Sequence, residues 1–466
     1  MNDWVNAEQH AERARTFFQN GEWDKALAEL SRAIELNPEQ GEWHFGMGLT
    51  LDALSRFTEA IASYEQALHL RGDDPEVMMH IAIDSIHLGH FDVAVQWLER
   101  CNELNPQFEP GYCYRIAAFA QLGDHERAEE MFYLARQIQD ECPHCYDHLA
   151  HSLEARGLSD KAIWCWQQTL RLAPDHADVR ASLGRAHVRK GQLERAGVYF
   201  EQQLAHHPDD LGTRLHLGRL QMNTDRWSEA GRTFRSILDV NPLHVESHSA
   251  LSEIAMHSGH IEEVISQCQL TAQLDPDYPG IHHRWALALL LRGQFDRACS
   301  TLSLELDKPD HSPKQAIDIS RTLMDIGMMP QAIALLGRVI QEVDFERQHD
   351  IAHPLAHVGH GEDASQTLAT MLVHRGYAYL VTGCREAGIA DCRRALKLVP
   401  GNALTLHNLA MAYLEGGQLK RAASFHRKAA ALRPKDAMIR RMKMRIARMA
   451  LTRRLSNVWI KLRGRF

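Results

Sequence analysis

The sequence repeats itself with a period of 34 residues, and this period limits the possible folds more than any other feature. The clearest copy runs from Pro143 to His176. Its first half carries an apolar stripe at helical spacing, formed by Tyr146, Leu149, Ala150 and Leu153. Gly157 then marks a turn, and Pro174 ends a second helical stretch. Each copy is therefore expected to form one helical hairpin.

Eleven further copies keep the same landmark residues in register. They begin at Ala7, Gly41, Pro75, Glu109, Ala177, Leu211, Val245, Pro279, Pro313, Ala369 and Ala403. An aromatic residue, a Leu-Ala pair, a later Ala-x3-aromatic pair and a final Pro resemble the tetratricopeptide repeat (TPR). The resemblance implies an all-α fold: a right-handed α-solenoid, or superhelix, of about twelve hairpins, each burying its apolar face against its neighbours.

The repeat register divides the chain into four segments. Residues 7–346 are expected to form repeats one to ten, residues 347–368 a His-rich insertion, residues 369–436 repeats eleven and twelve, and residues 437–466 a basic amphipathic helix that caps the array. These segments leave no room for a catalytic domain. The sequence also lacks a phosphate-binding glycine loop and the HExxH and GxSxG motifs. We therefore expect a protein that is not an enzyme and that needs no cofactor.

Composition indicates an ordinary core-forming protein, with 45% hydrophobic and 24% charged residues. The first ten residues have neither the basic nor the apolar region of a signal peptide, and the longest apolar run, residues 285–291, is too short to span a bilayer. The nine cysteines are expected to be reduced and mostly buried. Together these features predict a cytoplasmic protein.

The TPR resemblance implies a concave groove, lined by the first helices, that binds a peptide or a partner protein. In the middle of the array this groove should present Arg and His side chains: His148, His151, Arg185, Arg189, His216, Arg219 and Asn223. The planar guanidinium of Arg suits carboxylates, so the pattern predicts an acidic peptide segment as ligand. The alternative is that these residues are solvated surface charges.

Histidines occupy the sixth position of four repeats, at His80, His148, His216 and His374. Because imidazole can both donate and accept hydrogen bonds, these rings could hold the backbone of a bound peptide. Peptide binding would then weaken as the pH falls through the His range. The alternative is chance placement, since the chain contains 29 histidines.

Two groups of residues are candidates for metal binding. Cys142 and Cys145 form a CxxC pair, and His148 follows one helical turn later. In the insertion, His357 and His360 lie beyond Pro354, where a helix could begin. The alternatives are a metal-free repeat boundary in the first case and a polar loop in the second, because structural zinc normally has four ligands.

The C-terminal segment is strongly basic. Residues 437–466 contain ten Lys or Arg and no acid, so the preceding 436 residues carry 42 basic against 60 acidic side chains. The second half of this segment carries an apolar stripe formed by Leu455, Trp459, Leu462 and Phe466, and basic residues that include Arg453 and Arg454 flank it. Such a helix fits peripheral contact with an anionic membrane or a partner, or contact with the chain's own acidic array. A nucleic-acid partner is not expected.

These features together predict a non-enzymatic scaffold or adaptor that binds a protein partner in its groove. Two alternatives stay open. The chain could be an accessory subunit that selects substrates for a separately encoded enzyme, or a metal-responsive regulator that uses the His-rich insertion.

Overall fold

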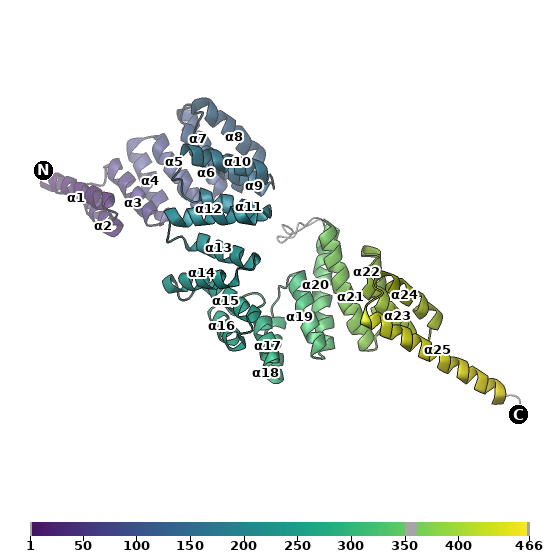
Figure 1. Cartoon of the computed structure of the whole chain (residues 1–466). Coiled ribbons are helices and arrows are strands. Elements are labelled where there is room, and N and C mark those ends of the chain that lie inside the picture. Colours follow the sequence, from purple (N-terminus) through teal and green to yellow (C-terminus); the bar gives the residue numbers. More distant parts are fainter. Residues whose placement is uncertain (1, 350–360, 464–466) are drawn as a thin grey trace. The chain divides into compact units, whose positions relative to one another are not determined.

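The computed structural model describes residues 2–349 and 361–463, and all regular secondary structure in those ranges is α-helical (Figure 1). The predicted all-α fold class is therefore confirmed. The chain divides into two compact units, unit 1 (Met1–Val240) and unit 2 (Asn241–Phe466). Each unit is described by itself.

Unit 1 contains the helices of the first seven repeats. In chain order they are α1 (Asn2–Gln19), α2 (Trp23–Leu36), α3 (Gly41–Ala53), α4 (Phe57–Arg71), α5 (Pro75–His87), α6 (Phe91–Leu104), α7 (Glu109–Gln121), α8 (His125–Ile138), α9 (Pro143–Ala155), α10 (Ser159–Leu172), α11 (Val179–Arg189), α12 (Leu193–His206), α13 (Leu211–Asn223) and α14 (Trp227–Val240).

Unit 2 contains the remaining helices. In chain order they are α15 (Val245–His257), α16 (Ile261–Leu274), α17 (Ile281–Leu291), α18 (Phe295–Leu306), α19 (Pro313–Asp325), α20 (Met329–His349), α21 (Gly361–Val381), α22 (Arg385–Leu398), α23 (Ala403–Glu415), α24 (Leu419–Leu432) and α25 (Ala437–Arg463).

Within each unit the helices pack in the order of the chain. The two helices of each predicted hairpin contact each other, from α1 with α2 to α23 with α24. In unit 1 the second helix of each hairpin also contacts the first helix of the next, and in unit 2 the same holds for α16 with α17, α20 with α21 and α22 with α23. The last helix, α25, packs on α24 and α23, where it caps the array as predicted. Because each hairpin touches mainly its neighbours, the apolar core runs along each unit as a series of local clusters.

The turn inside each hairpin depends on backbone conformation that favours glycine. Gly157, after α9, has φ of 73°, in the left-handed region that residues with a Cβ atom rarely adopt. Its amide N–H donates to the carbonyl oxygen of Glu154 at 2.9 Å, and the amide N–H of Leu158 donates to the carbonyl oxygen of Leu153 at 2.9 Å. The predicted helix stop at Gly157 is therefore confirmed.

The small residues that recur at fixed positions of the repeat have a direct packing reason in α11 and α12. Gly184 lies on α11 against the ring of Phe200 on α12, and an added Cβ would stand 2.6 Å from Cδ1 of that ring. Gly218 and Phe234 make the same contact in the following hairpin. Because the phenyl rings are fully buried, they cannot swing into solvent to make room. The small residue is what lets the two helices approach.

Replacing Gly184 by Ala is expected to destabilise unit 1 by about 1–3 kcal/mol, because the added methyl group overlaps the Phe200 ring. Gly197→Ala is the matched control: Gly197 is also helical, and its Cβ would meet Leu220 at an ordinary 3.5 Å. There the better helix propensity of Ala should stabilise by up to about 1 kcal/mol. Urea unfolding of both variants measures whether the free energy of unfolding changes with opposite signs. Equal changes in the two variants would contradict the packing argument.

The predicted His-rich segment lies between two long helices. Helix α20 continues to His349 and α21 begins at Gly361, so helices extend into both ends of residues 347–368. The metal candidates His357 and His360 lie outside the described residues. Among the residues that the structure describes, no helix is both long and apolar enough to cross a membrane.

Candidate functional site

The predicted groove residues lie on three first helices of unit 1. His148 and His151 belong to α9, Arg185 and Arg189 to α11, and His216, Arg219 and Asn223 to α13. All seven are at least partly exposed, and four of them are well exposed: His151, Arg189, Arg219 and Asn223. A face that is accessible on three successive hairpins can be reached by one extended ligand.

Helices α11 and α13 bring three basic side chains together: Arg185, His216 and Arg219, called the basic cluster below. His216 stacks on the Phe200 ring, with centroids 5.8 Å apart and 13° between the planes. Burial lowers the pKa of His216, and the positive charges of Arg185 and Arg219 lower it further. Burial likewise lowers the pKa of Arg185, with Arg189 adding to the effect. Both guanidinium groups are thus close enough to His216 to disfavour a positive charge on its ring.

Two of the other three basic groove residues, His151 and Arg189, lie against acids on α9. Arg189 forms a hydrogen-bonded ion pair with Glu154. His151 Nε2 lies 3.5 Å from Oδ1 of Asp147. Arg219, in contrast, pairs with no acid among the described residues. Among the described residues, the basic side chains of this face that form no ion pair with an acid therefore lie on α11 and α13, a narrower part of the face than the sequence predicted.

The sixth-position histidines are more buried than surface residues. Burial lowers the pKa of His80, His216 and His374, and it lowers that of His148 to about 4. These rings consequently stay neutral at pH values where an ordinary His is charged. Any loss of peptide binding caused by their protonation would occur below the usual His range.

The C-terminal candidates lie on α25 and beyond it. Leu455 is 60% exposed. Arg453, Arg454, Trp459 and Leu462 belong to the same helix, but their side chains are outside the described part, as is residue Phe466 altogether. Contact of this stripe with a membrane or a partner stays a prediction.

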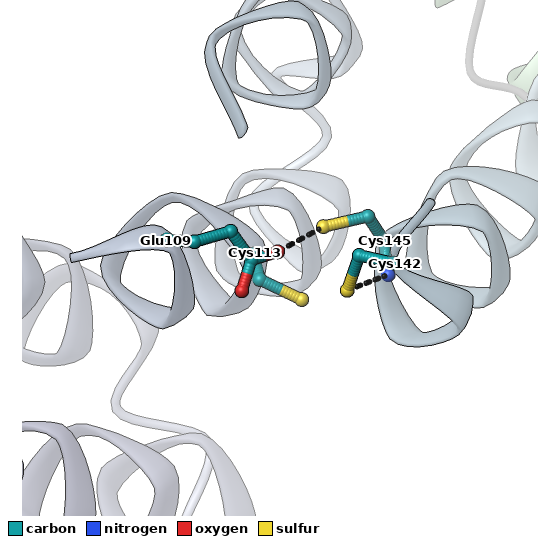
Figure 2. Close-up of side chains that lie close together, drawn as sticks. All are labelled: Glu109, Cys113, Cys142 and Cys145. Atoms are coloured by element: carbon teal, nitrogen blue, oxygen red, sulfur yellow. Dashed lines mark hydrogen bonds between the residues drawn. The ribbon is translucent and has the colours of Figure 1, made fainter. Parts of the chain in front are cut away.

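A second cluster of reactive side chains joins α7 to α9 (Figure 2). Glu109 and Cys113 come from the first two turns of α7, Cys142 directly precedes α9, and Cys145 lies in its first turn. Their sulfur and carboxylate oxygen atoms all lie within 4.8 Å of one another. This group is called the thiol cluster below. Its members are almost inaccessible, with exposed fractions of 9%, 3%, 6% and 1% respectively.

Hydrogen bonds within the thiol cluster favour a negative charge on Cys142. Cys142 is the N-cap of α9, and its sulfur accepts the backbone N–H of Cys145 at 3.4 Å. Hydrogen bonds from the thiols of Cys113 and Cys145 lower the pKa of Cys142, whereas the same bonds raise the pKa of the two donors. Cys145 has one proton, so it donates either to Cys142 or to Glu109, whose Oε1 is 3.0 Å away.

Glu109 is a buried acid without a basic partner. Burial raises the pKa of this carboxyl group to about 7, and the groups that act on it are cysteines. No Lys or Arg forms an ion pair with it among the described residues. A buried carboxylate is costly unless a cation or several donors compensate its charge.

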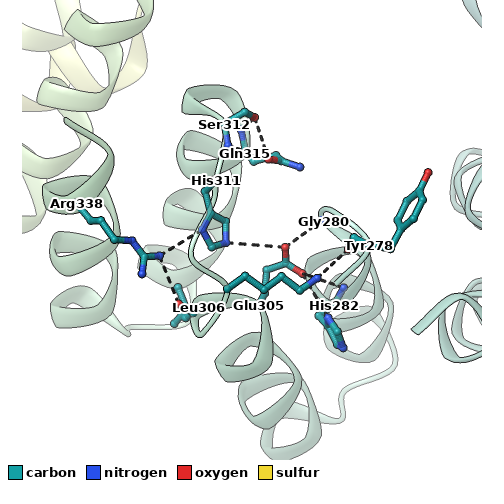
Figure 3. A network of polar contacts seen from close by, with 10 residues as sticks. Tyr278, Gly280, His282, Glu305, Leu306, His311, Ser312, Gln315 and Arg338 are labelled. Atoms are coloured by element: carbon teal, nitrogen blue, oxygen red, sulfur yellow. Dashed lines mark hydrogen bonds and ion pairs between the residues drawn. The ribbon is translucent and has the colours of Figure 1, made fainter. Parts of the chain in front are cut away.

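In unit 2, by contrast, a buried acid has hydrogen-bond donors and a cation that compensate its negative charge (Figure 3). Glu305, at the end of α18, is 1% exposed. Its carboxylate accepts the backbone N–H of Gly280 at 3.0 Å and that of His282 at 3.1 Å, and Nζ of Lys308 lies 3.4 Å away. Lys308 also donates to the carbonyl oxygen of Tyr278 at 2.8 Å. The network ties the start of α17 to the segment that follows α18.

Comparison of the sequence with known protein families agrees with the helical hairpins seen in the structure. Sequence models described as tetratricopeptide repeat match residues 12–75 and 149–210, residues 188–254, and residues 405–438. The chain is a tetratricopeptide repeat protein. The matched segments lie in both units, and each coincides with helices that pack as the hairpins described above.

Two curated proteins are similar to parts of this TPR chain. The U-box domain-containing protein 70 of Oryza sativa subsp. japonica is 27% identical over 122 residues, which are 26% of this chain and 15% of that protein. The human protein O-mannosyl-transferase TMTC1 is 24% identical over 188 residues, which are 39% of this chain and 20% of that protein. The chain thus spans a fifth or less of either relative.

Solved structures with a similar course of the chain include two that cover nearly all of this TPR array. The Cut9–Hcn1 hetero-tetramer of the APC/C covers 94% of this chain and 96% of the matched chain, at 14% identity and a TM-score of 0.44. Yeast Tom70 covers 96% of both, at 15% identity and a TM-score of 0.40. Both scores are low, so the family assignment rests on the repeat sequences.

The structure brings together only some of the metal candidates that the sequence suggested at this repeat boundary. Cys142 and Cys145 do lie together, but His148 is not in the thiol cluster: its ring packs near Tyr114, with centroids 5.8 Å apart. The missing members are Glu109 and Cys113, one repeat earlier. A signal for them existed, because the TPR places the first helices of successive repeats side by side, so residues about one period apart become neighbours.

Proposed function

We propose that this TPR protein is a scaffold that binds an acidic peptide segment of a protein partner, and that it acts by binding and not by catalysis. The basic cluster on α11 and α13 is the observation that carries the proposal. It contains an exposed Arg219 without an acidic partner among the described residues, beside Arg185 and His216.

The electrostatics of the basic cluster favour an anion. Arg185 is itself partly buried, and Asp178, Asp210 and Asp147 attract its charge without forming an ion pair with it among the described residues. Arg185 and Arg219 both act on the same His216 ring, so a positive charge there would be repelled by both guanidinium groups. A carboxylate placed between the two helices would relieve this repulsion and could accept two parallel N–H donors from a guanidinium. A peptide with a single acidic stretch could make these contacts while lying along the first helices.

Arg219→Glu is expected to weaken binding of a fluorescein-labelled Glu-rich peptide about tenfold, because one charge-assisted hydrogen bond contributes about 1.5–3 kcal/mol. Fluorescence anisotropy measures the affinity, with the Gln-rich counterpart of the peptide as the uncharged probe. The affinity of the native protein should also fall as salt is raised.

Arg195→Glu, an exposed reversal on α12, is the matched control because it changes the net charge equally but lies outside the basic cluster. It should leave the affinity within a factor of about two, as expected for a screened surface charge. Equal losses in the two variants would mean that only net charge matters. Absence of binding to the Glu-rich peptide by the native protein would reject the acidic ligand.

Three finer expectations accompany this proposal. The scaffold could serve a separately encoded enzyme as its substrate-selecting subunit, which predicts that an activity copurifies with it. The basic stripe of α25 is proposed to contact anionic lipid or a partner, and co-sedimentation with anionic liposomes tests the lipid version. The cytoplasmic location stays a prediction.

A further inference from the structure

The thiol cluster has a ligand set that the repeat itself does not require. At the preceding junction the equivalent positions hold Pro75, Met79, Phe108 and Gly111, and at the following junction Pro143, Asp147, His176 and Val179. Both neighbouring junctions pack without three thiols and a carboxyl group. The four side chains at the junction of α7 and α9 therefore need an explanation beyond helix packing.

The chemistry of this set matches one class of ligand. Three thiols and one carboxyl group become, on losing their protons, three thiolates and one carboxylate, which are established ligands of zinc. Glu109 also lacks a basic partner among the described residues, although its side chain is almost inaccessible. A bound divalent cation would supply the compensating positive charge.

The geometry is close to a tetrahedral site. Zinc bonds to sulfur at about 2.3 Å, so two sulfur ligands of one tetrahedron lie about 3.8 Å apart. The ligand atoms of the thiol cluster already lie within 4.8 Å of one another, and they converge from two helices toward a common centre (Figure 2).

The backbone holds two of the ligands in place. Cys142 precedes α9 and Cys145 lies within its first turn, so the N-terminal turn of the helix fixes their separation. The positive end of the helix and the Cys145 N–H both stabilise a thiolate at Cys142. Glu109 and Cys113 are four residues apart on α7, which places them on one face of that helix.

We propose that Glu109, Cys113, Cys142 and Cys145 bind one Zn²⁺ ion that crosslinks α7 to α9. Each thiol that binds gives its proton to solvent, and no electron transfer is involved. The ion ties the fourth repeat to the fifth, the repeat whose first helix carries Asp147 and Glu154, the acids that hold His151 and Arg189. Zinc would thereby stabilise the packing of α9 against α7, and α9 is the helix that precedes the basic cluster.

The test uses the full chain, purified under reducing conditions with zinc present and then freed of unbound metal. Mass spectrometry of metals should find one zinc ion per chain. Replacing zinc by Co²⁺ should give the visible absorption bands of a tetrahedral cobalt–thiolate site. Substituting both Cys142→Ser and Cys145→Ser should abolish the bound ion and these bands.

Two further variants separate metal binding from folding. Glu109→Gln keeps the shape of the side chain, and it should weaken zinc binding at least tenfold in competition with a chromophoric chelator. Cys165→Ser is the matched control, because Cys165 is also a buried thiol of unit 1 but lies outside the thiol cluster. It should retain one zinc ion. Circular dichroism confirms that each variant is folded.

Three results would overturn the proposal. One is a native protein that holds no zinc although its cysteines are reduced. Another is retention of zinc by the folded Cys142→Ser, Cys145→Ser variant. The third is a disulfide between members of the thiol cluster in protein kept under reducing conditions, since a disulfide removes two of the ligands.

Discussion

Replacing Glu305 by Gln is expected to lower the free energy of unfolding of unit 2 by about 3 kcal/mol, because it leaves a buried ammonium group without its counter-charge. Gln has nearly the same volume, so packing changes little. Its amide group, however, can accept only at one atom, whereas Glu305 accepts from Gly280 N–H through Oε1 and from His282 N–H through Oε2. Urea unfolding at neutral pH measures the difference.

The effect of this substitution should depend on pH with a defined sign. Burial opposes ionisation of Glu305, but hydrogen bonding with His282, the charge of Lys308 and the Gly280 N–H outweigh it and lower the pKa to about 2. Because the folded pKa lies below the ordinary value of 4.5, the stabilisation is complete above that pH and is lost as the pH falls toward 2. By pH 3.5 the native protein should have lost about 1 kcal/mol of the stabilisation that ionised Glu305 contributes to its free energy of unfolding.

Glu262→Gln is the control for the Glu305 experiment. Glu262 belongs to the same unit and pairs with Arg292 at 2.9 Å, but its side chain is 71% exposed. Exposed pairs contribute about 0.2–1 kcal/mol, so this variant should stay near native stability. If both substitutions cost the same, burial of Glu305 is not what makes its network stabilising.

Replacing Trp166 by Ala is expected to destabilise unit 1 by about 3–5 kcal/mol, the largest single effect predicted for this unit. Trp166 is the largest of the fully buried side chains and lies on α10. Its Nε1–H donates to Oδ1 of Asp147 on α9 at 2.9 Å. Truncation removes the packing between the two helices and leaves the Asp147 carboxylate with one donor fewer. Urea unfolding, followed by circular dichroism, measures the loss.

Trp164 provides an internal control two residues earlier on the same helix. Its side chain is 52% exposed and touches the ring of Tyr146 edge-on. Trp164→Ala should therefore cost no more than about 1–1.5 kcal/mol. Trp166→Phe keeps most of the apolar volume and removes the Nε1–H donor. Its loss of unfolding free energy should therefore lie between those of Trp164→Ala and Trp166→Ala. A Trp166→Ala variant as stable as Trp164→Ala would contradict the assignment of Trp166 to the core.

The helix pairs could be predicted from the sequence because the signals are local. The spacing of Tyr146 and Leu149 indicates one helix face, and Gly157 indicates the turn. Neither indication depends on any distant residue. The groove candidates were harder, since helical spacing tells which side a residue is on but not what balances its charge. Only packing shows that Arg189 is held by Glu154, 35 residues earlier, whereas Arg219 has no such partner among the described residues.

The sequence by itself determined the repeat, the all-α class and the family, because a 34-residue period with small residues at fixed positions is satisfied by stacked helical hairpins. The tertiary structure alone decided which side chains of different repeats meet. Glu109 joins Cys145, 36 residues away, and Glu305 meets the start of α17, 25 residues earlier. Such contacts depend on how closely particular helices approach, and that distance is set by the side chains packed between them.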